Sequence, residues 1–325
     1  MSKESKPNTT ELSVVIPVYN EEAVLPQLFD RLFPVLDGMG IPYEVVLVDD
    51  GSRDRSPTLL RQQHKLRPDT TRVVMLRNNV GQHVAIMAGF EASMGLRVVT
   101  LDADLQNPPE EIPRLLAEME RGHDYVGSIR RHRNDAKWRD MASKAMNRLR
   151  ERITRVHMTD QGCMLRAYDR EIVDAVLASD EAHTFIPALA YLYAANPIEI
   201  EVDHEERAAG ESKYPLYKLI HLNFDLMTGF SLMPLHVFSV VGIGISLISF
   251  LFVIYLAIRR LIVGPEVEGV FTLFGILFFL AGVILFGIGL LGEYVGRIYE
   301  QSRGRPHYLI RSHLRPTSDS RKSDE

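Results

Sequence analysis

Two long apolar runs near the C-terminus restrict what this chain can fold into more than any other feature. Residues 237–258 and 270–292 carry no charged side chain, and about 20 apolar residues in a helix are enough to cross the hydrocarbon core of a bilayer. A buried helix pair is the alternative, but core helices of soluble proteins rarely stay apolar on every side over such a length. The connector between the runs is short and contains Gly and Pro. We therefore predict two transmembrane helices, over 236–258 and 270–292, joined as an antiparallel hairpin.

The distribution of basic residues predicts the orientation of such a hairpin. Two spans leave the N-terminal part of the chain and the C-terminal tail, residues 293–325, on the same side of the membrane. The tail is rich in arginine, whereas the connector between the spans has Arg259 and Arg260. Because positively charged segments stay on the cytoplasmic side, we expect the N-terminal domain and the tail to face the cytoplasm.

Composition gives further expectations for the flanking segments and for partners. Residues 214–235 mix aromatic, basic and apolar side chains, which predicts interfacial amphipathic helices, with an ordinary packing helix as the alternative. Residues 1–11 are polar and lack the apolar core of a signal peptide, so we expect a flexible N-terminus. Cys163 is the single cysteine, which rules out an intrachain disulfide and favours a small buried side chain. The net charge of −5 gives no reason to expect a nucleic-acid partner.

Residues 12–213 alternate between strand-like and helix-like patterns. The β-branched runs "LSVVIPVYN" and "YEVVLVDDGS" stop at turn residues, and the segment between them has helical spacing and ends in glycine. Such alternation predicts an α/β domain with a Rossmann-like parallel sheet, in which ligands bind beyond the carboxyl ends of the strands. Neither GxGxxG nor GxxxxGK[ST] is present, so neither fingerprint explains this edge. The predicted strand ends are 17–21, 49–52, 79–82 and 102–106.

The segment "LDADLQNPPEE" places two carboxylates and an amide at one of these ends. If the strand continues in extended form, Asp102, Asp104 and Gln106 share one face, because side chains alternate along a strand. Neighbouring carboxylates repel each other unless a cation or a donor lies between them. Mg²⁺ and Mn²⁺ favour carboxylate oxygens and keep waters and substrate phosphates. We interpret the segment as a divalent-cation site for a diphosphate; an acidic surface pair without a ligand is the alternative.

Four segments carry a resemblance to a known family. "VVIPVYNEE", "VDDGS", "NVGQHVAIMAGF" and "DADLQNPPEE" resemble family 2 glycosyltransferases with the GT-A fold. With the two apolar runs, the chain is similar to polyprenyl-phosphate glycosyltransferases of bacterial inner membranes. The resemblance implies inverting, metal-dependent transfer of 4-deoxy-4-formamido-L-arabinose from its UDP donor to undecaprenyl phosphate. It further implies a role in lipid A modification and polymyxin resistance, and a homotetramer whose C-terminal segments are exchanged between protomers.

The resemblance also implies roles for individual residues. Asp160 falls where related enzymes place a catalytic aspartate, although Gln161 departs from the aromatic residue expected after it. A lipid phosphate monoester is already anionic at neutral pH, since its second pKa is about 6. Asp160 is therefore either a base or a positioning residue, with a helix cap or turn as the structural alternative. The implied sets are catalytic Asp160 and Asp104; nucleotide-binding Pro17, Tyr19, Glu21, Asp50 and Asp102; and metal-binding Asp102, Asp104 and Gln106.

Two basic segments, around 130–144 and 207–213, are candidates for the acceptor site. Arginine forks match the geometry of phosphate oxygens, and the resemblance assigns the lipid phosphate to Arg130, Arg139, Ser143 and Arg207. A solvated basic face drawn to anionic lipid is the alternative. Three other functions stay open: a glucosyl or mannosyl transferase acting on the same lipid, a processive polysaccharide synthase, and a non-catalytic membrane protein that binds nucleotide-sugars.

Overall fold

The computed structural model describes most of the chain as two compact units. The described residues are 10–130, 158–160, 162–179, 185–205, 232–263, 270–303 and 306–316. The first unit comprises Met1–Ala145, Arg155–Lys213 and Arg305–Glu325, and the second comprises Met146–Thr154 and Tyr214–Gly304. Apart from their edges, the predicted flexible N-terminus over 1–11 and the predicted interfacial helices over 214–235 lie outside the described residues.

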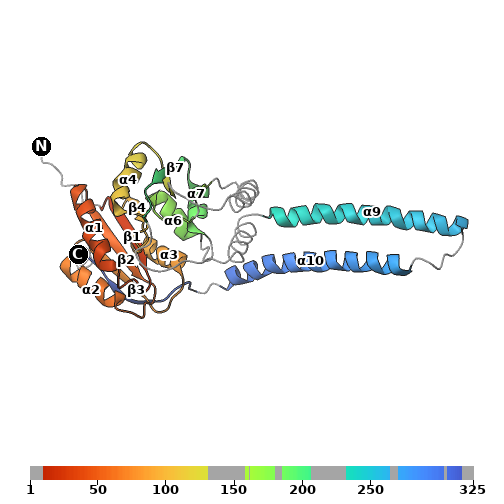
Figure 1. The fold of residues 1–325 in the computed structure, drawn as a ribbon, viewed down its shortest axis with the longest axis horizontal. Coiled ribbons are helices and arrows are strands. Elements are labelled where there is room, and N and C mark those ends of the chain that lie inside the picture. Colours follow the sequence, from red (N-terminus) through yellow and green to blue (C-terminus); the bar gives the residue numbers. More distant parts are fainter. Residues whose placement is uncertain are drawn as a thin grey trace. The chain divides into compact units, whose positions relative to one another are not determined.

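A mixed β-sheet forms the centre of the first unit (Figure 1). Over the described residues its strand order is β7-β5-β6-β4-β1-β2-β3-β8. The strands β4, β1, β2 and β3 are parallel neighbours, as the sequence predicts, while β6 and β8 run antiparallel to their partners. The strands are β1 (Leu12–Val18), β2 (Tyr43–Asp49), β3 (Thr71–Leu76), β4 (Arg97–Thr100), β5 (Tyr125–Arg130), β6 (Arg166–Asp169), β7 (Pro197–Val202) and β8 (Ile310–Leu314).

Helices cover both faces of this sheet. Helix α1 buries a row of leucines at helical spacing, Leu25, Leu28, Leu32 and Leu36, in one core with alternate residues of β1 and β2. Helix α3 approaches the opposite face so closely that a Cβ on Gly89 would lie 2.3 Å from Val15 Cγ1. The helices of this unit are α1 (Leu25–Gly38), α2 (Ser56–Leu66), α3 (Gln82–Ala92), the 3₁₀ helix η1 (Pro109–Glu111), α4 (Ile112–Glu120), α6 (Arg170–Ala178) and α7 (Ile186–Tyr193).

The parallel register brings the carboxyl ends of the central strands to one edge. Val18, at the end of β1, lies opposite Asp49, at the end of β2. Strand β4 ends earlier, because Thr100 lies opposite Val15. The segment that follows β4 therefore begins before the ends of β1 and β2 are reached. It lies at the carboxyl edge of the sheet, where ligands of open parallel sheets bind.

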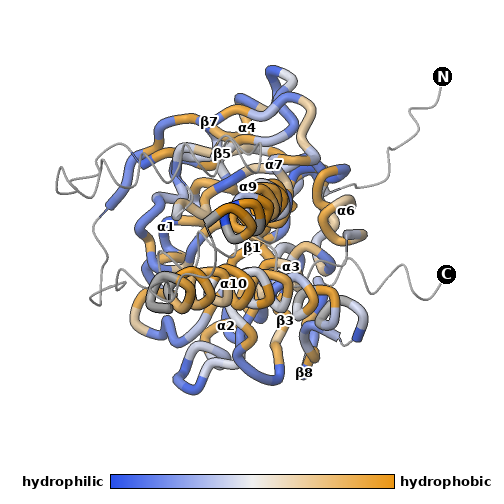
Figure 2. Tube along the Cα trace, turned by 90° about the vertical axis from the view of Figure 1, so that its right-hand side faces the viewer, coloured by the Kyte–Doolittle hydropathy of each residue, from blue (hydrophilic) through white to orange (hydrophobic). Residues whose placement is uncertain are grey.

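The second unit contains the two apolar helices. Helix α9 spans Met233–Val263 and α10 spans Val270–Ser302, and Figure 2 colours both as hydrophobic over most of their length. Stretches within them, Leu235–Leu256 and Ile276–Gly296, are long and apolar enough to cross a membrane. The rings of Phe238 and Phe286 lie 5.8 Å apart, so the helices pack side by side as the predicted hairpin. Both helices extend beyond the apolar runs that revealed them.

The chain returns to the sheet after this hairpin. Strand β8 pairs antiparallel with β3 of the same chain, and the Arg77 N–H donates to the Leu309 carbonyl at 2.9 Å. The Tyr308 hydroxyl donates to the Glu91 carboxylate on α3. The C-terminal segment is thus a structural part of the first unit, with its strand covering the β3 side of the sheet.

Gly51 provides the first test of this architecture. It has φ 68°, and an added Cβ would lie 2.6 Å from the Asn78 carbonyl carbon and 2.7 Å from the Asn79 nitrogen. Because both obstacles are backbone, Gly51→Ala is expected to destabilise the protein by about 2 kcal/mol. That corresponds to a fall in Tm of about 4–8 °C for a unit of this size, measurable by thermal unfolding in detergent. Gly38→Ala, which meets no atom within 4 Å, is the control and should leave Tm unchanged.

Candidate active site

Two loops at the carboxyl edge, those following β1 and β2, are joined by hydrogen bonds. The Asn20 and Glu21 N–H groups donate to the hydroxyls of Ser52 and Ser56, each at 3.0 Å. Asn20 adopts φ 57°, which turns the chain sharply after Tyr19. Tyr19 is 42 % exposed, so its ring is available to stack on a ligand. Together with Pro17 in β1, these loops form the edge to which the sequence assigns the nucleotide.

The second aspartate of "VDDGS" connects this edge to the start of α3. Both carboxylate oxygens of Asp50 accept backbone N–H groups, from Val80 at 2.8 Å and from Gly81 at 3.0 Å. Burial raises the pKa of Asp50, and these two N–H donors act in the opposite direction. Asp50 therefore fixes the loop before α3, in addition to the nucleotide contact that the family resemblance implies for it.

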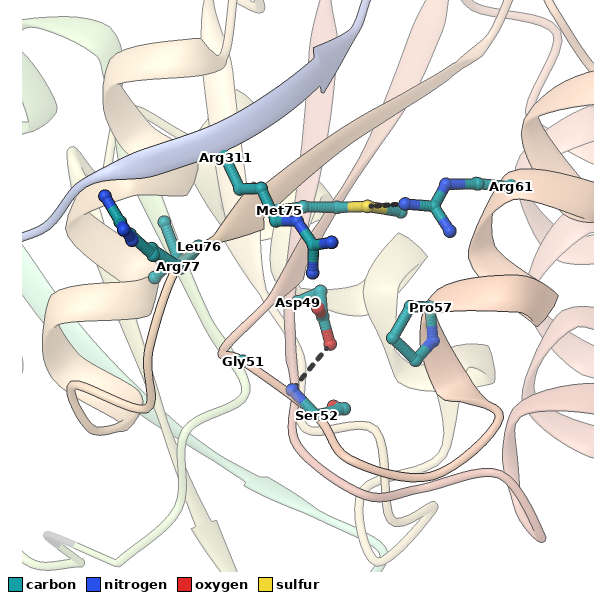
Figure 3. A pocket seen from close by; sticks show the side chains of 9 residues that line it. All are labelled: Asp49, Gly51, Ser52, Pro57, Arg61, Met75, Leu76, Arg77 and Arg311. Carbon is teal, nitrogen blue, oxygen red and sulfur yellow. Dashed lines mark hydrogen bonds between the residues drawn. The ribbon is translucent and has the colours of Figure 1, made fainter.

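The neighbouring Asp49 faces a different environment. It lies in a cavity of about 150 Å³ lined by Arg61, Arg77 and Arg311, among others. Figure 3 shows its carboxylate accepting the Ser52 N–H, with the Arg311 side chain above it. Burial raises the pKa of Asp49. The two adjacent aspartates of this motif therefore have different hydrogen-bond partners, although the charge of Asp49 also raises the pKa of Asp50.

The loop after β4 carries the D-x-D pair, and its backbone differs from the expected one. The expectation of a continuous strand is wrong: β4 ends at Thr100, and Leu105 has φ 59° with a buried side chain. A left-handed conformation is rare for a bulky residue. The turn instead joins Asp104 to Gln106, whose N–H donates to Asp104 Oδ1 at 3.1 Å. Asp102 Oδ1 accepts the side-chain amide N–H of Gln82, the first residue of α3, at 2.5 Å.

His204 is a member of this site that the motif search missed. It follows β7, and the next residue, Glu205, donates its N–H to the Gln106 carbonyl at 2.9 Å. Burial and the nearby Arg130 lower the pKa of His204, while Asp104 and Asp160 oppose that shift. Its Nδ1 atom is buried, and no described residue hydrogen-bonds to it. The sequence did contain a signal, since the alternating run "PIEIEV" predicts a strand that ends just before His204.

This donor set fits a divalent cation that is completed by a substrate. Among the residues that the structure describes, no three His, Cys, Asp or Glu side chains lie close enough together to hold a metal ion by themselves. Mg²⁺ sites commonly hold one or two carboxylates, with waters and substrate phosphates in the other positions. By residue type Asp102, Asp104 and Gln106 match that requirement. The His204 Nδ1 atom, which has no hydrogen-bond partner among the described residues, lies within electrostatic reach of Asp104.

Asp160 and Arg130 form the best-defined contact of the site. The Arg130 Nε and Nη2 groups donate to the two Asp160 oxygens at 2.6 and 2.8 Å, and the Gly162 N–H donates at 3.0 Å. Burial raises the pKa of Asp160, but Arg130 outweighs burial and holds that pKa below its ordinary value. The Asp160 side chain is only 6 % exposed. It is an ionised, hydrogen-bonded carboxylate at neutral pH.

A fully buried arginine holds the Asp160 loop through hydrogen bonds to its backbone carbonyls. Arg166, on β6, donates to the Asp160 carbonyl at 2.6 Å and the Cys163 carbonyl at 2.9 Å. It also donates to the Tyr125 hydroxyl and is 0 % exposed. Cys163 is buried, as predicted from its type. Arg166 was not among the residues singled out from the sequence; the signal was an arginine inside the apolar segment "GCMLRAY".

The structure thus brings the acidic loop and the Asp160–Arg130 pair together. The charge of Asp102 raises the pKa of Arg130, and the charges of Asp104 and Asp160 raise the pKa of His204. These groups come from the ends of β4, β5 and β7 and from the segment before β6. The other residues assigned to the acceptor phosphate, Arg139, Ser143 and Arg207, lie outside the described residues, as does Gln161.

Comparison with solved structures gives a distant match. Glucosyl-3-phosphoglycerate synthase from Mycobacterium tuberculosis, in complex with Mg²⁺ and UDP, is 19% identical and has a TM-score of 0.47. The match covers 67% of this chain and 77% of that chain. A likeness of this degree bears on neither the donor nor the metal of the present protein.

Comparison of sequences gives much stronger matches. The family model "Glycosyl transferase family 2" matches residues 13–177, and "GtrB C-terminal hairpin" matches residues 233–298. A relative from Aeromonas hydrophila is 51% identical over 95% of this chain and 96% of its own length. One from Shewanella sediminis is 51% identical over 98% and 97%. Both are named undecaprenyl-phosphate 4-deoxy-4-formamido-L-arabinose transferase. The resemblance inferred from the motifs is confirmed, and this chain is a glycosyltransferase that belongs to glycosyl transferase family 2.

Proposed function

We propose that this protein transfers 4-deoxy-4-formamido-L-arabinose from its UDP donor to undecaprenyl phosphate with inversion at the anomeric carbon. One observation carries the chemistry: at the carboxyl edge of the sheet, Asp102 lies within electrostatic reach of Arg130, and Asp104 lies within electrostatic reach of His204. An acidic metal–diphosphate site beside a guanidinium suits a reaction between two phosphate-bearing substrates. The names of relatives that match nearly the whole chain support the donor and the acceptor.

On the donor side, the loops after β1 and β2 would hold the nucleotide. Pro17, Tyr19, Glu21 and Asp50 lie in or beside these loops, and Asp102 is fixed by Gln82 at the adjoining edge. Asp104 and Gln106 would hold a divalent cation, with Asp102 and His204 beside them. When bound, Mg²⁺ or Mn²⁺ would supply Lewis-acid stabilisation of the charge that develops on the departing UDP.

On the acceptor side, no residue has to remove a proton. A phosphate monoester with a second pKa of about 6 is largely dianionic at neutral pH and attacks as it stands. Arg130 would face that phosphate, and the remaining ligands proposed from sequence are Arg139, Ser143 and Arg207. Asp160 engages the Arg130 guanidinium through two hydrogen bonds, so its proposed role is to position Arg130 rather than to act as a base.

The cellular part of the proposal follows from the same relatives and from the apolar helices. The protein would reside in a bacterial inner membrane through α9 and α10, with the catalytic domain on the cytoplasmic side. The formamido group of its product is a neutral amide. Removal of the formyl group would leave the cationic amine that, on lipid A, weakens the binding of polymyxin and other cationic peptides. A homotetramer is the proposed assembly.

A donor panel tests the assignment directly. Purified full-length protein in detergent, given undecaprenyl phosphate and Mn²⁺, should form glycolipid with UDP-4-deoxy-4-formamido-L-arabinose at a rate at least about 100-fold above that with UDP-glucose or GDP-mannose. Discrimination of this size is expected where a site hydrogen-bonds a group that the competitor lacks. Product is followed by mass spectrometry of the lipid fraction. Turnover confined to UDP-glucose or GDP-mannose would replace the proposed donor with that of a sibling enzyme.

A further inference from the structure

Arg31 is the centre of an ion-pair cluster next to the candidate metal site. It lies on α1, far from the site in sequence, and its side chain is 24 % exposed. Its guanidinium donates to both oxygens of Glu110, at 3.0 and 2.9 Å, and to both oxygens of Glu205, at 3.0 and 2.9 Å. Two bidentate contacts from one guanidinium fix its geometry more firmly than a single surface ion pair does.

The two carboxylates belong to the two segments that build the acidic edge. Glu110 lies in η1, directly after the loop that carries Asp104 and Gln106. Glu205 adjoins His204, and its backbone N–H donates to the Gln106 carbonyl at 2.9 Å. Arg31 therefore links η1, which follows the D-x-D loop, to the segment that contains His204.

A second set of contacts joins the same two segments without Arg31. Arg114 pairs with Glu111 and donates to the Glu201 carbonyl at 3.1 Å, and the Asp203 N–H donates to Glu111 at 3.4 Å. These contacts should keep α4 attached to β7 when Arg31 is changed. What Arg31 adds is the position of the Glu110 and Glu205 carboxylates.

We propose that Arg31 is a positioning residue of the metal site: by clamping Glu110 to Glu205 it holds His204 and the Asp104–Gln106 turn in the relative position that a divalent cation requires. The inference rests on the proposed function, since it presupposes a cation at this edge. Without Arg31, two carboxylates about half exposed, 48% and 50%, would face each other unpaired and repel. Groups that orient ligands from outside the coordination sphere typically change metal affinity by about 10–100-fold.

The test is Mn²⁺ binding rather than turnover. The full-length protein in detergent is titrated with Mn²⁺ in the presence of UDP, and free Mn²⁺ is measured by its electron paramagnetic resonance signal. Arg31→Met is expected to raise the Mn²⁺ dissociation constant about tenfold, and Arg31→Lys to restore part of the affinity, because an ammonium keeps the charge but not the double fork. Tm should stay nearly unchanged, since exposed ion pairs contribute little to stability.

Arg67 provides a matched control. Arg67 directly follows α2 and makes a similar bidentate pair with Asp37 of α1, at 3.0 and 2.9 Å. It also stacks on Phe33 at 4.4 Å. Within the part of the chain that the structure describes, Arg67 does not contact the acidic edge. Arg67→Met should leave the Mn²⁺ affinity unchanged. Equal affinities in Arg31→Met and the unaltered protein, or equal losses in both variants, would overturn the clamp. Failure of the unaltered protein to bind Mn²⁺ would overturn the metal site itself and the clamp with it.

Discussion

Asp104→Asn is expected to lower turnover by about 10²–10³-fold while leaving the fold intact. The substitution removes one negative charge from the site proposed to neutralise the departing UDP, and losing one such stabilising group costs about 10²–10³-fold in other enzymes. The side chain keeps its size. The Asn amide oxygen can still accept the Gln106 N–H that Asp104 Oδ1 accepts at 3.1 Å, so the turn should survive. Transfer of sugar to undecaprenyl phosphate is measured at saturating Mn²⁺, beside Tm.

Asp124→Asn is the matched control for this variant. The Asp124 carboxylate accepts two backbone N–H groups, from Ala195 at 2.5 Å and from Asn196 at 3.0 Å, but it lies before β5, at the opposite edge of the sheet. Turnover by the Asp124→Asn variant should equal that of the unaltered protein. Excess chelator should abolish turnover by the unaltered protein, and added Mn²⁺ should restore it. Full activity of Asp104→Asn, or undiminished turnover in chelator, would remove the metal from the mechanism.

The central sheet and the acidic loop were predictable from sequence because each signal is local. A β-branched run that stops at "VDDGS" or "LDADLQ" marks both a strand and its end, and parallel neighbours align such ends without any long-range information. The turn at Leu105 was not predictable, since leucine gives no sign of a left-handed backbone. Its φ of 59° replaces the expected strand by a hydrogen-bonded turn that still joins Asp104 to Gln106.

The residues that sequence reasoning missed depend on sheet order. Strand β7 pairs with β5, and only that pairing carries His204 to the loop after β4. Arg31 reaches the same loop from α1 through carboxylates on two other segments. In the sequence Arg166 only interrupts an apolar run. In the fold its position on β6 lets it donate to the Asp160 carbonyl. Contacts of this kind arise from tertiary packing between distant segments, which a single sequence does not encode in any local pattern.

Asp160→Asn and Arg130→Met are expected to lower kcat/KM for the lipid acceptor about 100-fold each, and the double variant about 100-fold as well. A displaced catalytic contact costs about 10²-fold. If Asp160 acts only by holding Arg130 through the 2.6 and 2.8 Å contacts, removing either partner removes the same function. Residues in one contact are strongly non-additive. A proton-removing Asp160 acting independently of Arg130 would instead give a loss of about 10⁴-fold in the double variant.

The pH dependence separates the two roles a second time. Arg130 holds the pKa of Asp160 below its ordinary value of 3.8, so this carboxylate stays ionised from pH 5 to pH 9 and contributes no inflection there. The acidic limb of kcat/KM should instead follow the second ionisation of the lipid phosphate at about pH 6. That limb should persist in Asp160→Asn. Its disappearance in Asp160→Asn would assign the proton transfer to Asp160 and reduce the Arg130 pair to a structural contact.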